Sequence, residues 1–140
     1  MEFLTTEDLQ THSYGRFITD STADFAAALD NSEIQVIALI RSKLNARYDV
    51  DAIFAATGTA RHNLIIRVCA FLTLHDVFRR NAARKYDEEK DVNYKWAMKW
   101  LQDVRDRNES PDGLPTIAIE SGNPSADILW GDSSDPNNFL

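Results

Sequence analysis

The sequence predicts an all-α fold, a small helical bundle of about four to five helices with an extended C-terminal arm. In residues 1–107, apolar side chains recur at spacings of three and four, which is the period of a helix face. All four prolines lie in residues 108–140. Residues 1–107 hold 16 acidic and 15 basic side chains, whereas residues 108–140 hold six acidic side chains and no basic one. We therefore expect a helical domain, residues 1–107, and an acidic, proline-containing arm, residues 108–140.

The N-terminal region predicts two short helices. A threonine cap followed by acidic residues favours a helix over residues 6–11. A turn around Gly15 follows, and a second short helix is expected over residues 23–29. Asp30 and Glu33 then have the spacing of a capping box, which predicts the start of a new helix.

The next predicted helix, residues 32–47, has two apolar faces. One face carries Ile34, Ile37, Leu44 and Tyr48, and the other carries Val36 and Ile40. One apolar stripe is enough for a helix at the surface of a bundle, so the second face indicates a second partner. We therefore predict that Val36 and Ile40 lie at an oligomer interface, together with Arg47 at the end of the helix.

The central part of the chain predicts one buried helix. Residues 49–59 are expected to form a loop, with Gly58 as a helix breaker. Residues 60–80 are apolar nearly all round the helix, which is typical of a helix at the centre of a bundle. The mixed-charge run at residues 79–91 is expected to be a solvated helix end and loop. The last helix, residues 92–106, has one clear apolar stripe and a charged opposite face.

Trp96 lies near the polar boundary of that last helix. Two interpretations remain open from the sequence, since the ring could pack in the core or anchor a partner. Tryptophan is enriched at the centres of protein interfaces. Trp96 is therefore a further candidate for the oligomer interface.

The arm carries large apolar groups in an acidic setting. An alternation of apolar and polar residues predicts a short strand at residues 116–119 that needs an edge to join. Apolar side chains in a polar linker favour docking onto partners. We predict three successive partner-binding anchors: Ile117 and Ile119, then Ile128, Leu129 and Trp130, then Phe139 and Leu140.

The residue chemistry argues against an enzyme. The histidines His12, His62 and His75 are scattered, and no two have the i,i+3 or i,i+4 spacing of a helical metal site. No phosphate-binding loop, dinucleotide fingerprint or nucleophile elbow occurs. His75 and the single cysteine, Cys69, are expected to be core residues. We expect no catalytic residue, no metal and no cofactor.

Composition also limits the kinds of partner that we expect this chain to bind. No apolar run approaches the roughly 18 residues that a membrane helix needs, and the first ten residues lack the pattern of a secretory signal. Clustered basic residues, which neutralise phosphates, are absent from the arm. We therefore expect no membrane and no specific nucleic-acid binding.

Four stretches resemble a known family. They are FLTTEDL at residues 3–9, LNARYDV at 44–50, LHDVFRR at 74–80 and YKWAMKWLQDVRDRN at 94–108. Together they resemble the small head–tail connector (neck adaptor) proteins of tailed phages, and within these the Mu-like branch. Arg47 and Tyr48 match the "RY" turn of that branch, and its final-helix pattern is matched by Tyr94, Ala97, Trp100 and Leu101.

The resemblance covers about residues 3–115. Asp49 departs from it, because a proline often follows the "RY" pair. The arm beyond Glu120 matches no family pattern, so its docking role is inferred from physical chemistry alone.

The resemblance implies a virion protein of the neck, made in the bacterial host cytoplasm and without catalytic residues. It implies a homo-oligomeric ring, usually of twelve copies, that binds the portal protein and receives a stopper or tail-completion protein. DNA would pass through the lumen without specific binding. The alternative from a different class is a non-catalytic regulatory helical domain whose acidic arm binds a basic protein partner.

Overall fold

The structure, a computed structural model, describes residues 1–12, 23–80 and 88–117. Within these ranges the chain forms the helices α1 (Thr6–His12), α3 (Ala23–Leu44), α4 (Val50–Ala55), α5 (Asn63–Arg80) and α6 (Glu88–Arg105), and a 3-10 turn at Gly58–Ala60. The described residues contain no strand beyond a single isolated β-bridge. The all-α fold is therefore confirmed.

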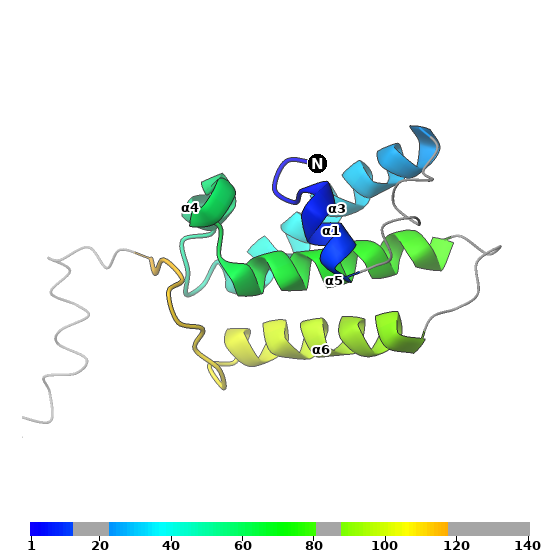
Figure 1. The fold of residues 1–140 in the computed structure, drawn as a ribbon. Helices are drawn as coiled ribbons and strands as arrows, with labels where there is room; N and C mark the ends of the chain where they lie inside the picture. Colours follow the sequence, from blue (N-terminus) through cyan, green and yellow to red (C-terminus); the bar gives the residue numbers. More distant parts are fainter. Residues whose placement is uncertain (13–22, 81–87, 118–140) are drawn as a thin grey trace, which may run out of the picture.

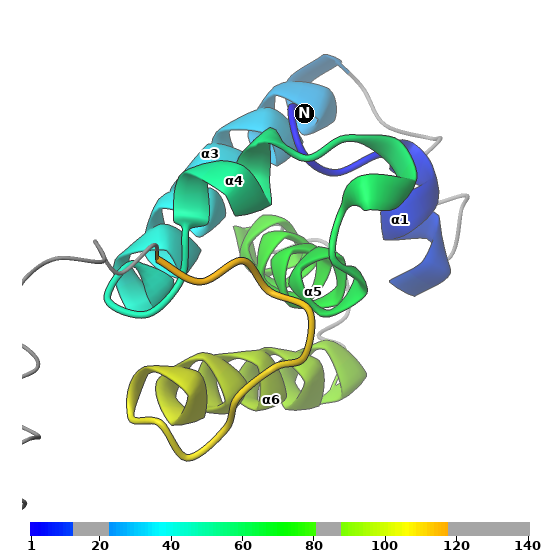
Figure 2. The ribbon, with the colours of Figure 1, turned by 90° about the vertical axis from the view of Figure 1, so that its left-hand side faces the viewer.

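Helix α5 lies at the centre of the bundle. It packs against α1, α3 and α6, and the view along its axis shows α3 and α6 on different sides of it (Figures 1 and 2). Its buried apolar residues occur on most of its circumference: Ile65, Val68, Cys69, Ala70, Phe71, Leu72, Leu74 and Val77. The prediction of a central helix is confirmed. No helix in the described ranges combines the length and hydropathy that a bilayer crossing needs.

Helix α3 runs without a break through the predicted helix start at Asp30 and Glu33. That prediction was wrong because the polar residues of this stretch bind other elements. The Oγ atom of Ser32 donates to Oδ2 of Asp76 on α5, at 2.8 Å. The Glu33 carboxylate is buried and binds the N-terminal segment of the chain.

The core-facing side of α3 carries Val36 and Ile40, two of the four residues that were predicted at an oligomer interface. Ile40 is 0% exposed and Val36 is also buried, so neither offers surface to a partner in this subunit. Ile34, by contrast, is 59% exposed. Ile34 and Val36 are about 200° apart around a helix, and the bundle covers the side that carries Val36. The assignment of Val36 and Ile40 to an exposed second face was therefore wrong.

Helix α4 replaces part of the predicted loop at residues 49–59. Asp49 begins it, because its side chain accepts a hydrogen bond from the backbone N–H of Ala52, at 3.1 Å. The helix is six residues long and buries Ile53. A segment this short shows too few apolar repeats for a helical period to be recognised.

Helix α6 begins earlier than predicted, at Glu88 instead of residue 92. Its first turn carries Glu88, Glu89 and Asp91. Negative charge at this end of a helix interacts favourably with the helix dipole. Its core side is formed by Ala97, Trp100, Leu101 and Val104. Part of the charged run that was predicted as loop is thus the first turn of a helix, and residues 81–87 lie outside the described part.

The segment that follows α6 returns to the turn between α3 and α4. The backbone N–H of Asp49 donates to the carbonyl oxygen of Pro115 at 2.8 Å, and Tyr48 and Thr116 form an antiparallel bridge. Leu114 is buried against the body. The first residues of the predicted strand at 116–119 therefore pair with the turn after α3 of the same chain.

Candidate partner-binding surface

The N-terminal segment is fixed by the buried carboxylate of Glu33. This group accepts backbone N–H bonds from Glu2 at 2.7 Å, Phe3 at 3.1 Å and Leu4 at 2.6 Å. Charge-assisted bonds of this kind are stronger than neutral ones. The stretch that begins the family resemblance is therefore joined to the middle of α3.

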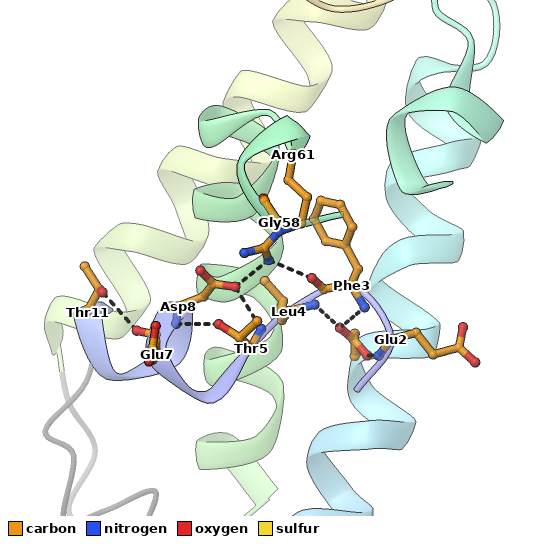
Figure 3. A network of polar contacts seen from close by, with 10 residues as sticks. Glu2, Phe3, Leu4, Thr5, Glu7, Asp8, Thr11, Gly58 and Arg61 are labelled. Atoms are coloured by element: carbon orange, nitrogen blue, oxygen red, sulfur yellow. Dashed lines mark hydrogen bonds and ion pairs between the residues drawn. The ribbon is translucent and has the colours of Figure 1, made fainter. Parts of the chain in front are cut away.

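Arg61 holds the same segment from the other side (Figure 3). Its Nη1 atom donates to the carbonyl oxygen of Phe3 at 2.7 Å and to Oδ2 of Asp8 at 2.6 Å. Burial by itself would raise the pKa of Asp8, but the hydrogen bonds from Arg61 and Thr5 outweigh it and lower the pKa. This ion pair has a structural role, and little of it is exposed.

Arg47, a predicted interface residue, is engaged within its own chain. Its Nη1 atom donates to the carbonyl oxygen of Val104 at 2.6 Å and of Glu109 at 3.1 Å, and Nη2 donates to Oγ of Ser110 at 2.9 Å. The guanidinium also lies over the ring of Tyr48, with Cζ 5.3 Å from the centroid. Arg47, half-buried, therefore binds the end of α6 within its own chain, and its predicted place at an oligomer interface stays a prediction.

Trp96, another predicted interface residue, lies at the surface of the subunit. It is 38% exposed, and Val92, one helical turn before it, is 63% exposed. Residues four apart lie on one face of a helix. The Trp96 ring and that of buried Phe71 of α5 form a T-shaped pair, with centroids 5.9 Å apart and planes at 82°. Trp96 thus rests on the core and still presents apolar surface.

Arg67 of α5 completes this surface. Its Cζ atom lies 5.1 Å from the centroid of Trp96 and 5.3 Å from that of Phe71. The ring of His12 meets Phe71 edge-on at 4.8 Å, and burial, with a smaller effect of Arg67, lowers the pKa of His12. We call Arg67, Val92 and Trp96, with Phe71 and His12 behind them, the α5–α6 patch.

The predicted arm anchors are only partly described. Ile117 is 45% exposed, and its backbone N–H donates to the carbonyl oxygen of Arg47 at 3.4 Å. The other anchors lie outside the described residues: Ile119, Ile128, Leu129, Trp130, Phe139 and Leu140.

His75 is a packed histidine. It is buried, and its ring stacks on Tyr94 of α6 with centroids 4.0 Å apart and planes at 17°. Its Nε2 atom lies 3.8 Å from Oδ1 of Asp91. Burial is the largest influence and lowers its pKa, while the charge of Asp91 opposes the shift. This packing agrees with the predicted core position.

The lowered pKa of His75 predicts that acid weakens the fold. Between its ordinary pKa of 6.5 and the lower folded value, the unfolded chain binds more protons, so the free energy of unfolding falls as pH falls. Urea unfolding at pH 7.5 and 5.5 should show this loss, which for one group is at most about 1.4 kcal/mol per pH unit. The His75→Gln variant should show a shallower pH dependence. An unchanged dependence would exclude His75 as its source.

Other polar groups of the described part give no second site. No group of three or more His, Cys, Asp or Glu side chains is arranged to hold a metal there. Cys69 is fully buried, and burial raises the pKa of its thiol. A hollow of about 420 Å³ lies between α4 and the segment after α6. His62 lines it, but the ring Nε2 is already 2.7 Å from the carbonyl oxygen of Asp112.

The chain gave no match in comparisons with family models, curated proteins and solved structures.

Proposed function

We propose that this chain is a structural head–tail adaptor of a tailed bacteriophage, which forms a ring below the portal and joins the capsid to a stopper or tail-completion protein. The observation that carries the proposal is the exposed Trp96 and Val92 on α6, supported from below by the core residue Phe71. A large aromatic side chain held at the surface of a small bundle is typical of a subunit that contacts other proteins.

The resemblance to connector proteins supports the same function. Several residues of the matching stretches make tertiary hydrogen bonds. Arg47 binds the end of α6, and the segment at residues 3–9 is bound by Glu33 and Arg61. Three of the four matching stretches thus take part in contacts that hold the bundle together, as expected of a shared fold.

The charge distribution suits a component of a DNA channel. Residues 1–107 carry a net charge of −1 and residues 108–140 carry −6. A lumen lined by such subunits would not hold phosphates through clustered cations, so DNA could move through it. The acidic arm, with its apolar groups, would dock on the portal or on adjacent subunits.

Removal of residues 118–140 is expected to reduce binding to portal-bearing capsids at least tenfold. The cut is placed after Ile117 because residues 114–117 are bound to the body. Each docked apolar anchor contributes about 1–3 kcal/mol, and a ring multiplies the effect by avidity. Co-sedimentation with capsids measures the bound fraction. A full-length chain with Ser133→Ala and Ser134→Ala is the control, and undiminished binding of the truncated chain would rule out a docking arm.

A further inference from the structure

We propose that the α5–α6 patch is the docking site for residues 127–132 of the arm of a second copy of this chain. In this arrangement Trp130 packs on Trp96 and Val92, while one of the two aspartates that flank its apolar run faces Arg67. The closure of such contacts into a ring rests on the proposed adaptor function, whereas the contact between two copies does not.

The patch has the composition of an interface centre. Trp96 and Val92 form an exposed apolar strip along one face of α6. Arg67 lies over the Trp96 ring from the neighbouring helix. Tryptophan and arginine are the residues most enriched among those that dominate binding energy, and the contact with Phe71 limits the freedom of Trp96 before binding.

Charge complementarity identifies the occupant. Within the described part of the chain, no carboxylate forms an ion pair with Arg67, whose recorded contacts are the two aromatic rings. In the arm, Asp127 and Asp132 flank the apolar run Ile128, Leu129 and Trp130. The apolar run of the arm therefore matches the apolar strip of Trp96 and Val92, and a flanking aspartate matches the cation Arg67.

The acidic residues at the start of α6 limit where the docked segment can lie. Glu88 and Glu89 occupy the first turn of α6, one turn before Val92. Like charges at this end would repel the arm. One aspartate of the segment is therefore expected beside Arg67, with Trp130 on the apolar strip.

The position where the arm leaves the body favours a neighbouring copy. Figure 2 shows the described chain ending beside α3 and α4, whereas α1 lies on the other side of α5. The patch is formed where α5 meets α1 and α6. The end of the described chain and the α5–α6 patch thus lie on different sides of one subunit. This is the arrangement of a heterologous contact, which closes into a ring when the rotation between copies permits.

The arm is long enough for this contact. The start of the proposed segment, Asp127, lies ten residues after Ile117 in the sequence, and ten extended steps span up to about 33–36 Å. Helix α6, with 18 residues, is about 27 Å long. The segment can therefore reach across a neighbouring bundle of this size.

A fluorescent peptide of residues 118–140 tests the proposal when it is titrated into the full-length protein and followed by anisotropy. We expect saturable binding that Arg67→Glu weakens at least tenfold. Arg105→Glu is the matched control, because Arg105 is also exposed and lies nine residues from Trp96, on the opposite face of α6. A peptide carrying Asp127→Lys and Asp132→Lys should bind the Arg67→Glu protein more tightly than the unchanged peptide does.

Several results would overturn the proposal. They are the absence of peptide binding at millimolar concentration, equal binding by the Arg67→Glu and Arg105→Glu proteins, and full binding by a peptide with Trp130→Ala. Because the assay uses no capsids, its failure is separable from failure of the adaptor function. If the protein binds capsids but its α5–α6 patch binds no peptide, the adaptor function stands and the docking proposal fails. If the patch binds the peptide but the protein does not bind capsids, the contact between copies stands and the adaptor function fails.

Discussion

The Glu33→Ala variant is expected to lose about 3–5 kcal/mol of the free energy of unfolding. The carboxylate is almost completely buried and accepts three backbone N–H bonds, from Glu2, Phe3 and Leu4. Alanine would leave these donors without a partner, and each unsatisfied buried donor costs about 1–3 kcal/mol. Since small domains have only about 5–15 kcal/mol in total, the loss should be evident in urea unfolding.

Two further variants make the result interpretable. Glu33→Gln keeps one acceptor but places an amide N–H₂ group against backbone donors, so its loss should be smaller than that of Glu33→Ala and still measurable. Gln35→Ala, on the exposed side of α3, should change the free energy of unfolding by less than about 0.5 kcal/mol. A loss below 1 kcal/mol for Glu33→Ala would mean that the N-terminal segment does not depend on this carboxylate.

The Ile40→Ala variant is expected to lose about 2–5 kcal/mol, because it removes methyl and methylene groups from a fully buried position and leaves a cavity. The loss should be independent of protein concentration, since the side chain is covered within one subunit. Urea unfolding at protein concentrations tenfold apart tests both points.

Ile34→Ala is the matched control for Ile40→Ala, because the same side chain is removed from the same helix at an exposed position. Its effect should stay within about 0.5 kcal/mol. If Ile40→Ala instead caused a small loss that grew on dilution, Ile40 would be an interface residue, as the sequence pattern predicted.

The elements that the sequence predicted well are those whose signal is local. Helix α5 is apolar on nearly every side, and a buried position at the centre follows from that pattern alone. The start of α1 follows from Thr5, whose side chain and backbone bond reciprocally with Asp8. Such signals need no knowledge of distant residues.

The errors occur where a distant residue decides the outcome. Ser32 and Glu33 read as a helix start because their partners, on α5 and at the N-terminus, are remote in sequence. Arg47 gave no sign that it would bind the end of α6, 57 residues along the chain. In each case tertiary hydrogen bonds give a polar group a role that its neighbours in the sequence do not indicate.

The candidate site was predicted in part. Trp96 was identified from its place at the polar boundary of its helix. Arg67 interrupts an otherwise apolar helix, and that interruption was the available signal for a surface position. The sequence could not show that the two residues meet, because contacts between α5 and α6 depend on how the helices pack.

We propose that apolar surface left open on one subunit is covered by other copies and by neighbouring virion proteins. Electron cryomicroscopy of the assembled neck at side-chain resolution tests it most directly. The account predicts a ring of this protein below the portal, in which Trp96 of each copy is covered by Trp130 of the next. Density for Trp130 against its own subunit, or a ring that leaves Trp96 open to solvent, would contradict it.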